Sequence, residues 1–166
     1  LSNPEIVRTV RKLVKNWKLK LVVDPVMIST TGHSLLQKRA LSELLRLMRS
    51  AELVTPNLQE AEVMAGMKIR SLRDMERAAR KIRRRVRAKA VLVKGGHLPG
   101  QDVTDVLLFR NRIFHYSSPR VEGRFHGAGC SYSAAIAGEL AKGADIQEAV
   151  NNARRFMSEA LKMAKE

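Results

Sequence analysis

Hydrophobic and polar positions along the chain follow two periods, one typical of helices and one typical of strands. Helix-like patterns occupy five segments, residues 3–17, 33–48, 57–66, 71–86 and 146–164. Short apolar runs that predict strands occupy residues 19–27, 51–57 and 89–96. Residues 105–116 predict a hairpin that turns at positions 110–112, and an alanine-rich helix follows the glycine-rich turn near residue 127.

Strands that alternate with helices predict an α/β fold, with a parallel sheet covered by helices on both faces. Ligands of such sheets bind beyond the carboxyl ends of the strands. Polar and glycine residues follow the predicted strands at four places, residues 24–25, 55–57, 94–97 and 127–129. We therefore expect four strand ends to direct chemistry toward one edge of the sheet.

The 166 residues are 45% hydrophobic and only 4% aromatic, which predicts one domain with an aliphatic core. Lys and Arg number 31 against 16 Asp and Glu, so the formal net charge is +15. The densest basic segment is residues 77–90, where Ala78, Ala79, Ile82 and Val86 recur at helical spacing. Because few aromatic residues accompany these charges, we interpret them as a solvated helix face and not as a nucleic-acid site.

Cysteine use and apolar run length bear on the compartment. Cys130 is the only cysteine, which excludes an internal disulfide and fits a reducing environment. The longest apolar runs are too short to span a bilayer, and no signal peptide opens the sequence. We expect a cytoplasmic protein that makes no membrane contact.

The turn that leads into the alanine-rich helix is a candidate anion site. Free amides at a helix start and the helix dipole attract anions, and Gly127 and Gly129 on either side of Ala128 let a phosphate approach the backbone closely. The same field would favour the thiolate of Cys130. The alternative is a glycine turn with a small buried cysteine that packs against Ala134, and spacing alone leaves both interpretations open.

Two charged residues at strand ends are further candidates. Lys94, followed by Gly95 and Gly96, suits a cation that neutralises phosphate on a tight turn, or a lysine that extends from a strand end to solvent. Asp24, followed by Pro25, suits a residue that orients Mg²⁺ or a substrate hydroxyl, or a plain Asp-Pro turn.

Asn57 and Glu60 open a predicted helix. On spacing alone a capping box is the favoured interpretation, and Mg²⁺ held by Glu60 through water is the alternative. The same spacing predicts two further capping boxes, Ser71 with Asp74 and Asp145 with Glu148.

The order of the motifs is more specific than any one of them. The segments VVDPVM, VTPNLQEAE, VLVKGGHL, DVLL and HGAGCSYSAAIAGELAKG together resemble the hydroxymethylpyrimidine/phosphomethylpyrimidine kinase family of thiamine biosynthesis. The resemblance runs from the first residue to the last predicted helix. It implies a ribokinase-like three-layer α/β/α fold with a mostly parallel central sheet. It also implies phosphorylation of hydroxymethylpyrimidine or its monophosphate with ATP and Mg²⁺.

The resemblance assigns roles to the glycine turn and the cysteine. In the family this turn forms the anion hole for the transferring phosphoryl group, which implies that role for Gly127, Ala128 and Gly129. The family's cysteine takes the place of the catalytic aspartate in sugar-kinase relatives, which implies a substrate-contacting base at Cys130. The usual turn is HGTGC, so Ala128 departs from the pattern and removes one hydroxyl.

The resemblance also assigns the nucleotide and metal residues. The lysine of the KGGH segment implies that Lys94, with Gly95 and Gly96, binds nucleotide phosphate. The family's asparagine and glutamate near magnesium correspond to Asn57 and Glu60, which implies that Asn57 belongs to the nucleotide site and that Glu60 is a metal residue.

The DPV segment of the family lies beside substrate and metal, which implies that position for Asp24 and Val26.

Two other functions stay open, a pyridoxal or pyridoxine kinase-type activity and an inactive basic remnant that binds nucleic acid or an acidic partner.

The first residues resemble the middle of the family's domain. We therefore expect residues 1–166 to form a single partial kinase domain that lacks roughly the N-terminal third. The sheet would then expose an edge. Association with the missing segment, or formation of a homodimer, would cover that edge.

Overall fold

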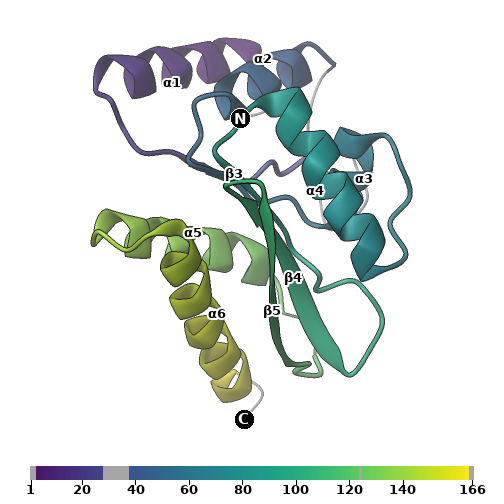
Figure 1. Cartoon of the computed structure of the whole chain (residues 1–166). Helices are drawn as coiled ribbons and strands as arrows, with labels where there is room; N and C mark the ends of the chain where they lie inside the picture. Colours follow the sequence, from purple (N-terminus) through teal and green to yellow (C-terminus); the bar gives the residue numbers. More distant parts are fainter. Residues whose placement is uncertain (1–2, 28–37, 124, 165–166) are drawn as a thin grey trace.

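The computed structural model describes residues 3–27, 38–123 and 125–164, which form six helices and five strands (Figure 1). The helices are α1 (Pro4–Asn16), α2 (Lys38–Met48), α3 (Leu58–Ala65), α4 (Leu72–Val86), α5 (Ala128–Ala141) and α6 (Ile146–Met163). The strands are β1 (Val22–Val23), β2 (Leu53–Val54), β3 (Ala90–Val93), β4 (Asp102–Phe109) and β5 (Arg112–Pro119). Residues 33–37 of the predicted second helix lie outside the described residues.

The strands form one sheet in the order β1-β2-β3-β4-β5. β1, β2 and β3 pair in parallel, with Leu53 opposite both Val22 and Ala90. β4 pairs antiparallel with β3, and β5 reverses again, so β5 runs in the same direction as β1 to β3. The carboxyl ends of these four strands therefore lie at one edge, as the sequence predicts. The sheet is mixed because β4 and β5 form a hairpin.

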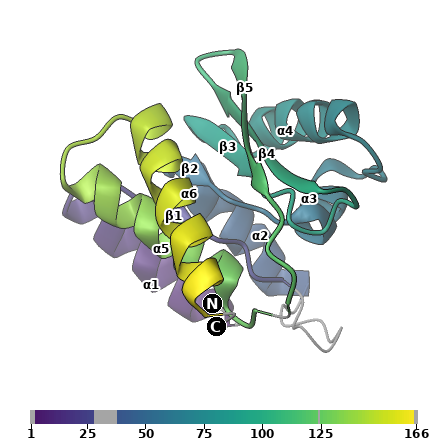
Figure 2. The same cartoon turned by 90° about the horizontal axis from the view of Figure 1, so that it is seen from below.

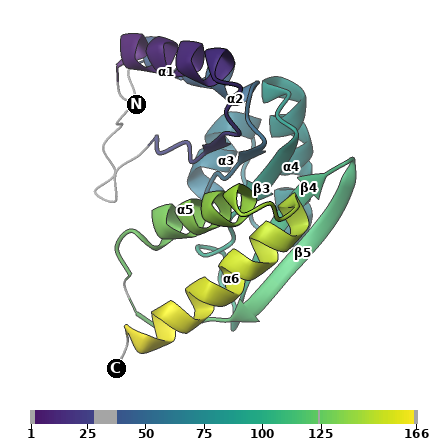
Figure 3. The same ribbon diagram turned by 90° about the vertical axis from the view of Figure 1, so that its left-hand side faces the viewer.

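Helices cover both faces of the sheet, which confirms the three-layer prediction. In β3, Val91 and Val93 belong to the apolar cluster with α1 to α4, whereas Ala90 and Leu92 belong to the cluster with α5 and α6. This alternation follows from the two-residue period of a strand. Figure 2 shows α5 and α6 on one side of the sheet and α3 and α4 on the other. In Figure 3, α5 and α6 lie in front of the sheet.

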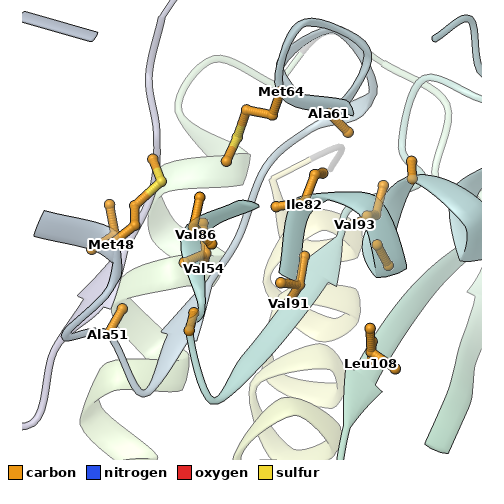
Figure 4. Packing of buried hydrophobic residues seen from close by; sticks show 14 of the residues in the cluster. Met48, Ala51, Val54, Ala61, Met64, Ile82, Val86, Val91, Val93 and Leu108 are labelled. Atoms are coloured by element: carbon orange, nitrogen blue, oxygen red, sulfur yellow. The ribbon is translucent and has the colours of Figure 1, made fainter. Parts of the chain in front are cut away.

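The larger core is aliphatic, as the low aromatic content predicts. Met48 from α2 and Ile82 from α4 are fully buried against Val54, Val91 and Leu108 of the sheet (Figure 4). Apolar side chains such as these stabilise a fold by about 1.5–3 kcal/mol each when they are fully buried.

Helix α4 has the predicted amphipathic pattern. Ala78, Ala79, Ile82 and Val86 are buried, whereas the arginines of its outer face are exposed. Residues 77–86 of the basic segment therefore contribute apolar side chains to the core and charges to the surface.

The paired strands are shorter than the apolar runs that predict them. In the first two runs only Val22–Val23 and Leu53–Val54 form strands. The reason is that Pro25 and Pro56 have no backbone N–H to continue a ladder. The chain turns at the first proline, where the Val26 N–H donates to the Asp24 carbonyl at 2.9 Å.

One of the three predicted capping boxes forms completely. Asn57 and Glu60 exchange both hydrogen bonds at the start of α3. The prediction for Ser71 with Asp74 is wrong for one of the two hydrogen bonds of a capping box. The Asp74 carboxylate accepts from the Arg70 N–H and the Ser71 hydroxyl.

The prediction for Asp145 with Glu148 is wrong in the same sense. Asp145 accepts from the Glu148 N–H at 2.9 Å, and the reciprocal bond is absent among the described contacts of α6.

Candidate active site

A buried ion pair joins two of the strand ends. Lys94 Nζ donates to both carboxylate oxygens of Asp24, at 2.9 and 3.1 Å. The two side chains are 10% and 16% exposed. Lys94 follows β3 directly and Asp24 follows β1, so the parallel order of the strands brings them together.

Lys94 is fixed by its backbone as well as by its side chain. Its N–H donates to the Pro56 carbonyl at 2.8 Å, and it forms an isolated parallel bridge with Asn57. A lysine this deeply buried needs an anionic partner, because desolvation penalises a lone charge. The alternative of a lysine that extends to solvent is therefore wrong. For Asp24 the two alternatives coexist, because this residue forms the Asp-Pro turn and also pairs with Lys94.

Ser133 of α5 completes this cluster, and sequence reasoning missed it. Its hydroxyl donates to Asp24 at 3.1 Å, lies 3.5 Å from Lys94 Nζ and lies 2.9 Å from the Thr55 hydroxyl. The Gly129 carbonyl also accepts from Ser133, because residues i and i+4 of a helix face the same side. A serine on the buried face of an otherwise apolar helix was the only signal in the sequence.

The start of α5 lies directly beside this cluster. Lys94 Nζ is 3.4 Å from the Gly129 carbonyl, and a Cβ added at Gly129 would lie 3.3 Å from Lys94 Nζ. Gly127 has a φ of +80° and caps the helix without a side-chain hydrogen bond. Within the part of the chain that the structure describes, the first amides of the helix, including those of Ala128 and Gly129, therefore have no helical or side-chain acceptor.

Cys130 is exposed in the first turn of α5. The interpretation of Cys130 as a buried structural cysteine is therefore wrong. Its thiol lies at the start of α5 and is open to solvent.

Glu60 is buried at the start of α3, next to the Lys94 cluster. Its carboxylate accepts from the Asn57 N–H at 2.8 Å, and Asn57 accepts from the Glu60 N–H at 2.9 Å. Burial raises the pKa of Glu60, while the Asn57 N–H and the charge of Lys94 oppose that rise. The charge of Asp24 also raises this pKa, so the two carboxylates lie within each other's field.

These two carboxylates are the oxygen ligands that the site offers to a metal ion. The residues that the structure describes contain no group of three or more His, Cys, Asp or Glu that could hold a metal. Magnesium is commonly bound by one or two carboxylates together with water and substrate phosphates, so Asp24 and Glu60 fit such an ion.

The glycines after Lys94 differ in their surroundings. A Cβ at Gly95 would lie 1.9 Å from the Thr104 carbonyl oxygen, so only glycine fits. The Gly95 N–H donates to Asp105 at 2.8 Å. Gly96 is exposed, with nothing within 4 Å of an added Cβ.

Asp105 is a buried residue of the site region that sequence reasoning did not single out. It is 1% exposed and forms an ion pair with Arg154 of α6. Burial raises the pKa of Asp105, and the Arg154 charge opposes the rise. Arg154 also donates to the Ser118 hydroxyl at 3.0 Å. These bonds connect the turn after β3 to the last helix.

Val26 lies apart from the contacts above. The residue is 43% exposed, and its only described hydrogen bond is the turn to Asp24. The structure thus gathers Asp24, Lys94, Glu60 and the start of α5 at one sheet edge, with Val26 beside them in sequence and open to solvent. None of the described helices is long and apolar enough to cross a membrane.

The fold and this edge define an α/β protein whose site suits a phosphate group. A helix start with free amides, a lysine and two carboxylates for a cation is the combination that phosphoryl transfer uses. The chain belongs to the phosphomethylpyrimidine kinase family, whose model matches residues 1–166.

The individual relatives agree with this assignment. The hydroxymethylpyrimidine/phosphomethylpyrimidine kinase of Aquifex aeolicus is 36% identical over 99% of this chain and 66% of its own length. The phosphomethylpyrimidine kinase structure from Clostridium difficile has a TM-score of 0.81 at 39% identity, over 97% of this chain and 66% of that one. An ADP complex of Bacillus subtilis pyridoxal kinase has a TM-score of 0.86 at 35% identity, over 94% and 60%.

These structures confirm the ribokinase-like fold. This chain spans about two thirds or less of the length of the relatives it matches.

Proposed function

We propose that this chain carries the nucleotide-binding and phosphoryl-transfer part of a kinase that uses ATP and Mg²⁺. Its substrate would be hydroxymethylpyrimidine or its monophosphate. The observation that carries the proposal is Lys94 Nζ, which lies 2.9 Å from Asp24 and 3.4 Å from the carbonyl of Gly129. A cation, a carboxylate and a helix start thus meet at one point of the sheet edge.

The backbone at residues 127–129 would bind the transferring phosphoryl group. Phosphoryl transfer depends on positioning and on charge stabilisation more than on covalent chemistry. Amides that are already free and oriented stabilise charge without reorganisation. Lys94, followed by Gly95 and Gly96, would neutralise the nucleotide phosphates, and the open space at Gly96 would let a phosphate approach the backbone.

Cys130 would act as the base toward the substrate hydroxyl. Its exposure lets a substrate reach the sulfur, and its position in the first turn of α5 places it beside the proposed phosphoryl site. The thiolate would accept the proton of the hydroxymethyl group as the oxygen attacks the γ-phosphorus. The bond from the γ-phosphorus to the β,γ-bridging oxygen would break at the same time, and ADP would leave.

Asp24 and Glu60 would hold Mg²⁺ from the protein side, with Asn57 orienting Glu60 through their two hydrogen bonds. When bound, the ion would neutralise phosphate charge. A cation would also favour the ionised form of Glu60, which burial otherwise disfavours. Val26, exposed after Asp24, would contact the substrate.

The relatives support a pyrimidine substrate, and one specific observation supports a second one. The ADP complex noted above is named as a pyridoxal kinase and has a TM-score of 0.86. The test is one ATP-consumption assay with hydroxymethylpyrimidine, its monophosphate and pyridoxal in parallel. Faster turnover of either pyrimidine supports the proposal, and faster turnover of pyridoxal supports the second function. Absence of turnover with all three would contradict both for this chain.

We propose that residues 1–166 form part of one kinase domain and that its open edge binds a further segment. β1 is the edge strand of the described sheet. Ile6 and Trp17 of the neighbouring N-terminal region are 52% and 68% exposed. The relatives possess a segment beyond the matched part, and such a segment, in the same chain or in another, would cover this edge. The alternative is that a second copy of this chain covers it. An exposed free cysteine further supports a reducing, cytoplasmic location.

A further inference from the structure

The loop between β3 and β4, residues 94–101, begins with the proposed nucleotide lysine and is held by one arginine. Arg120 directly follows β5, and its N–H donates to the Gln101 carbonyl at 2.8 Å. This bond extends the β4–β5 pairing by one step beyond Asp102 and Pro119. The end of the hairpin thereby delivers the Arg120 side chain to the loop.

The guanidinium of Arg120 binds three carbonyl groups of this loop. Nε donates to Gly100 O at 2.8 Å, Nη1 donates to Gly96 O at 2.8 Å, and Nη2 donates to Leu98 O. All three nitrogens of a rigid planar group are used, so the three carbonyls must converge on one plane. A lysine ammonium carries its three donors on a single nitrogen and cannot impose that arrangement.

Fixing these carbonyls also fixes the amides that follow them. In a trans peptide the carbonyl oxygen and the next N–H point in opposite directions, and the described chain has no cis peptide bond. With Gly96 O and Gly100 O bound to Arg120, the N–H groups of His97 and Gln101 point away from the guanidinium. These two amides and that of Gly96 have no acceptor among the residues the structure describes.

The amide groups that remain free in this loop follow Lys94 closely in the chain. Gly95 is held in place, because its N–H donates to Asp105 and its backbone lies close against the Thr104 carbonyl. The loop is therefore held on one side by Asp105 and on the other by Arg120. Arg120 also forms no ion pair with a carboxylate in the described chain, so its charge adds to the positive field of the loop.

We propose that Arg120 is a positioning residue for the nucleotide. It holds loop 94–101 so that the free amides after Lys94 face an anionic group of ATP. This inference rests on the proposed kinase function, and it goes beyond it by assigning a residue that makes no hydrogen bond to Asp24, Lys94 or Glu60.

The test compares Arg120→Lys with Arg112→Lys. Arg112 lies at the opposite end of β5 and stacks on Phe114, so its substitution is the matched control. We expect Arg120→Lys to raise the Kd for Mg-ATP, and the KM for ATP, about tenfold. We expect kcat at saturating ATP to stay within about twofold of the wild-type value, since the loop binds ATP in the ground state as well as in the transition state. The control should bind as the wild type does.

Hydrogen exchange of the ligand-free chain provides a second measurement. The Leu98 N–H donates to Gly95 O at 2.9 Å within the loop, so it should lose protection in Arg120→Lys and keep it in the control. Wild-type nucleotide affinity in Arg120→Lys, or unchanged protection of Leu98, would overturn the proposal while the kinase function stands. If the wild-type chain itself does not bind Mg-ATP, the kinase function fails and the nucleotide role of Arg120 fails with it. The exchange of Leu98 then decides whether Arg120 orders the loop.

Discussion

Asp24 and Lys94 lie 70 positions apart in the sequence, yet their side chains form a hydrogen-bonded ion pair of 2.9 Å at the ends of β1 and β3. Ser133 binds the same carboxylate from α5. The pair therefore connects two strands and one helix at the sheet edge where we place the phosphates. It serves folding and, in our proposal, function.

Breaking this pair from one side should destabilise the chain. We expect Lys94→Met to lower the free energy of unfolding by about 3 kcal/mol, because it leaves the largely buried Asp24 without its cation. Asp24→Asn combined with Lys94→Met should recover part of that loss. Urea unfolding of both variants measures the two effects. Equal stability of Lys94→Met and wild type would show that the pair is not structurally important.

The burial of Glu60 predicts a pH effect with a definite sign. Its pKa is raised in the folded state, so the folded chain holds this proton above pH 4.5, where the unfolded chain releases it. The free energy of unfolding should therefore fall as the pH rises from 4.5 through the folded-state pKa. Glu60→Gln keeps an oxygen for the Asn57 N–H and should remove this loss, so without Mg²⁺ it should be the more stable form at neutral pH.

Glu62 is the control for this effect, because its pKa shifts the other way. The Ile69 N–H and Lys68 lower the pKa of Glu62, so its contribution to stability is present above pH 4.5 and is lost as the pH falls through the folded-state pKa. Chemical unfolding of Glu60→Gln and Glu62→Gln from pH 4 to 8 compares the two. Identical pH profiles for wild type and Glu60→Gln would contradict the burial argument.

The two glycines after Lys94 should respond differently to alanine. Gly95→Ala places a Cβ 1.9 Å from the Thr104 carbonyl, so the backbone must shift and we expect a loss of more than about 2 kcal/mol in stability. Gly96→Ala meets no atom within 4 Å and should fold normally.

Only ligand binding should distinguish Gly96→Ala from wild type. If a phosphate approaches the backbone at Gly96, the added methyl group should weaken Mg-ATP binding while the melting temperature of the free chain stays the same. Unchanged nucleotide affinity would remove Gly96 from the proposed site.

Cys130 should matter for turnover and not for folding. An exposed residue contributes little to stability, so Cys130→Ala should change the free energy of unfolding by less than about 0.5 kcal/mol. Loss of a general base should reduce kcat by about 10²–10⁴-fold. Ser131→Ala, also exposed and one position further along α5, is the control. Turnover in Cys130→Ala equal to that of the control would exclude the base.

Much of the fold follows from local patterns in the sequence. Apolar periodicity located the helices, and charged residues at the ends of the apolar runs, such as Asp24 and Lys94, mark the edge of the sheet where we place the site. The patterns overestimated the lengths of β1 and β2, because an apolar run indicates burial and does not indicate how many residues pair with a neighbouring strand.

The supporting residues of the site were not predictable in the same way. Arg120 binds carbonyls 20 to 24 positions before it, and Arg154 pairs with Asp105 at a separation of 49. Such contacts depend on the register of the hairpin and on the packing of α6, which no local spacing encodes. Ser133 lies in the segment HGAGCSYSAAIAGELAKG, but only the approach of α5 to β1 shows that its hydroxyl reaches Asp24.

The central claim is that this chain forms a working nucleotide site, and thermal unfolding with and without Mg-ATP tests it most directly. Ligand at about a hundred times its Kd should add about 2.7 kcal/mol of stability. That corresponds to a rise of about 5–10 °C in the melting temperature of a domain of this size. We expect this rise in wild type and its absence in Lys94→Met. A melting temperature that does not respond to Mg-ATP would contradict the claim.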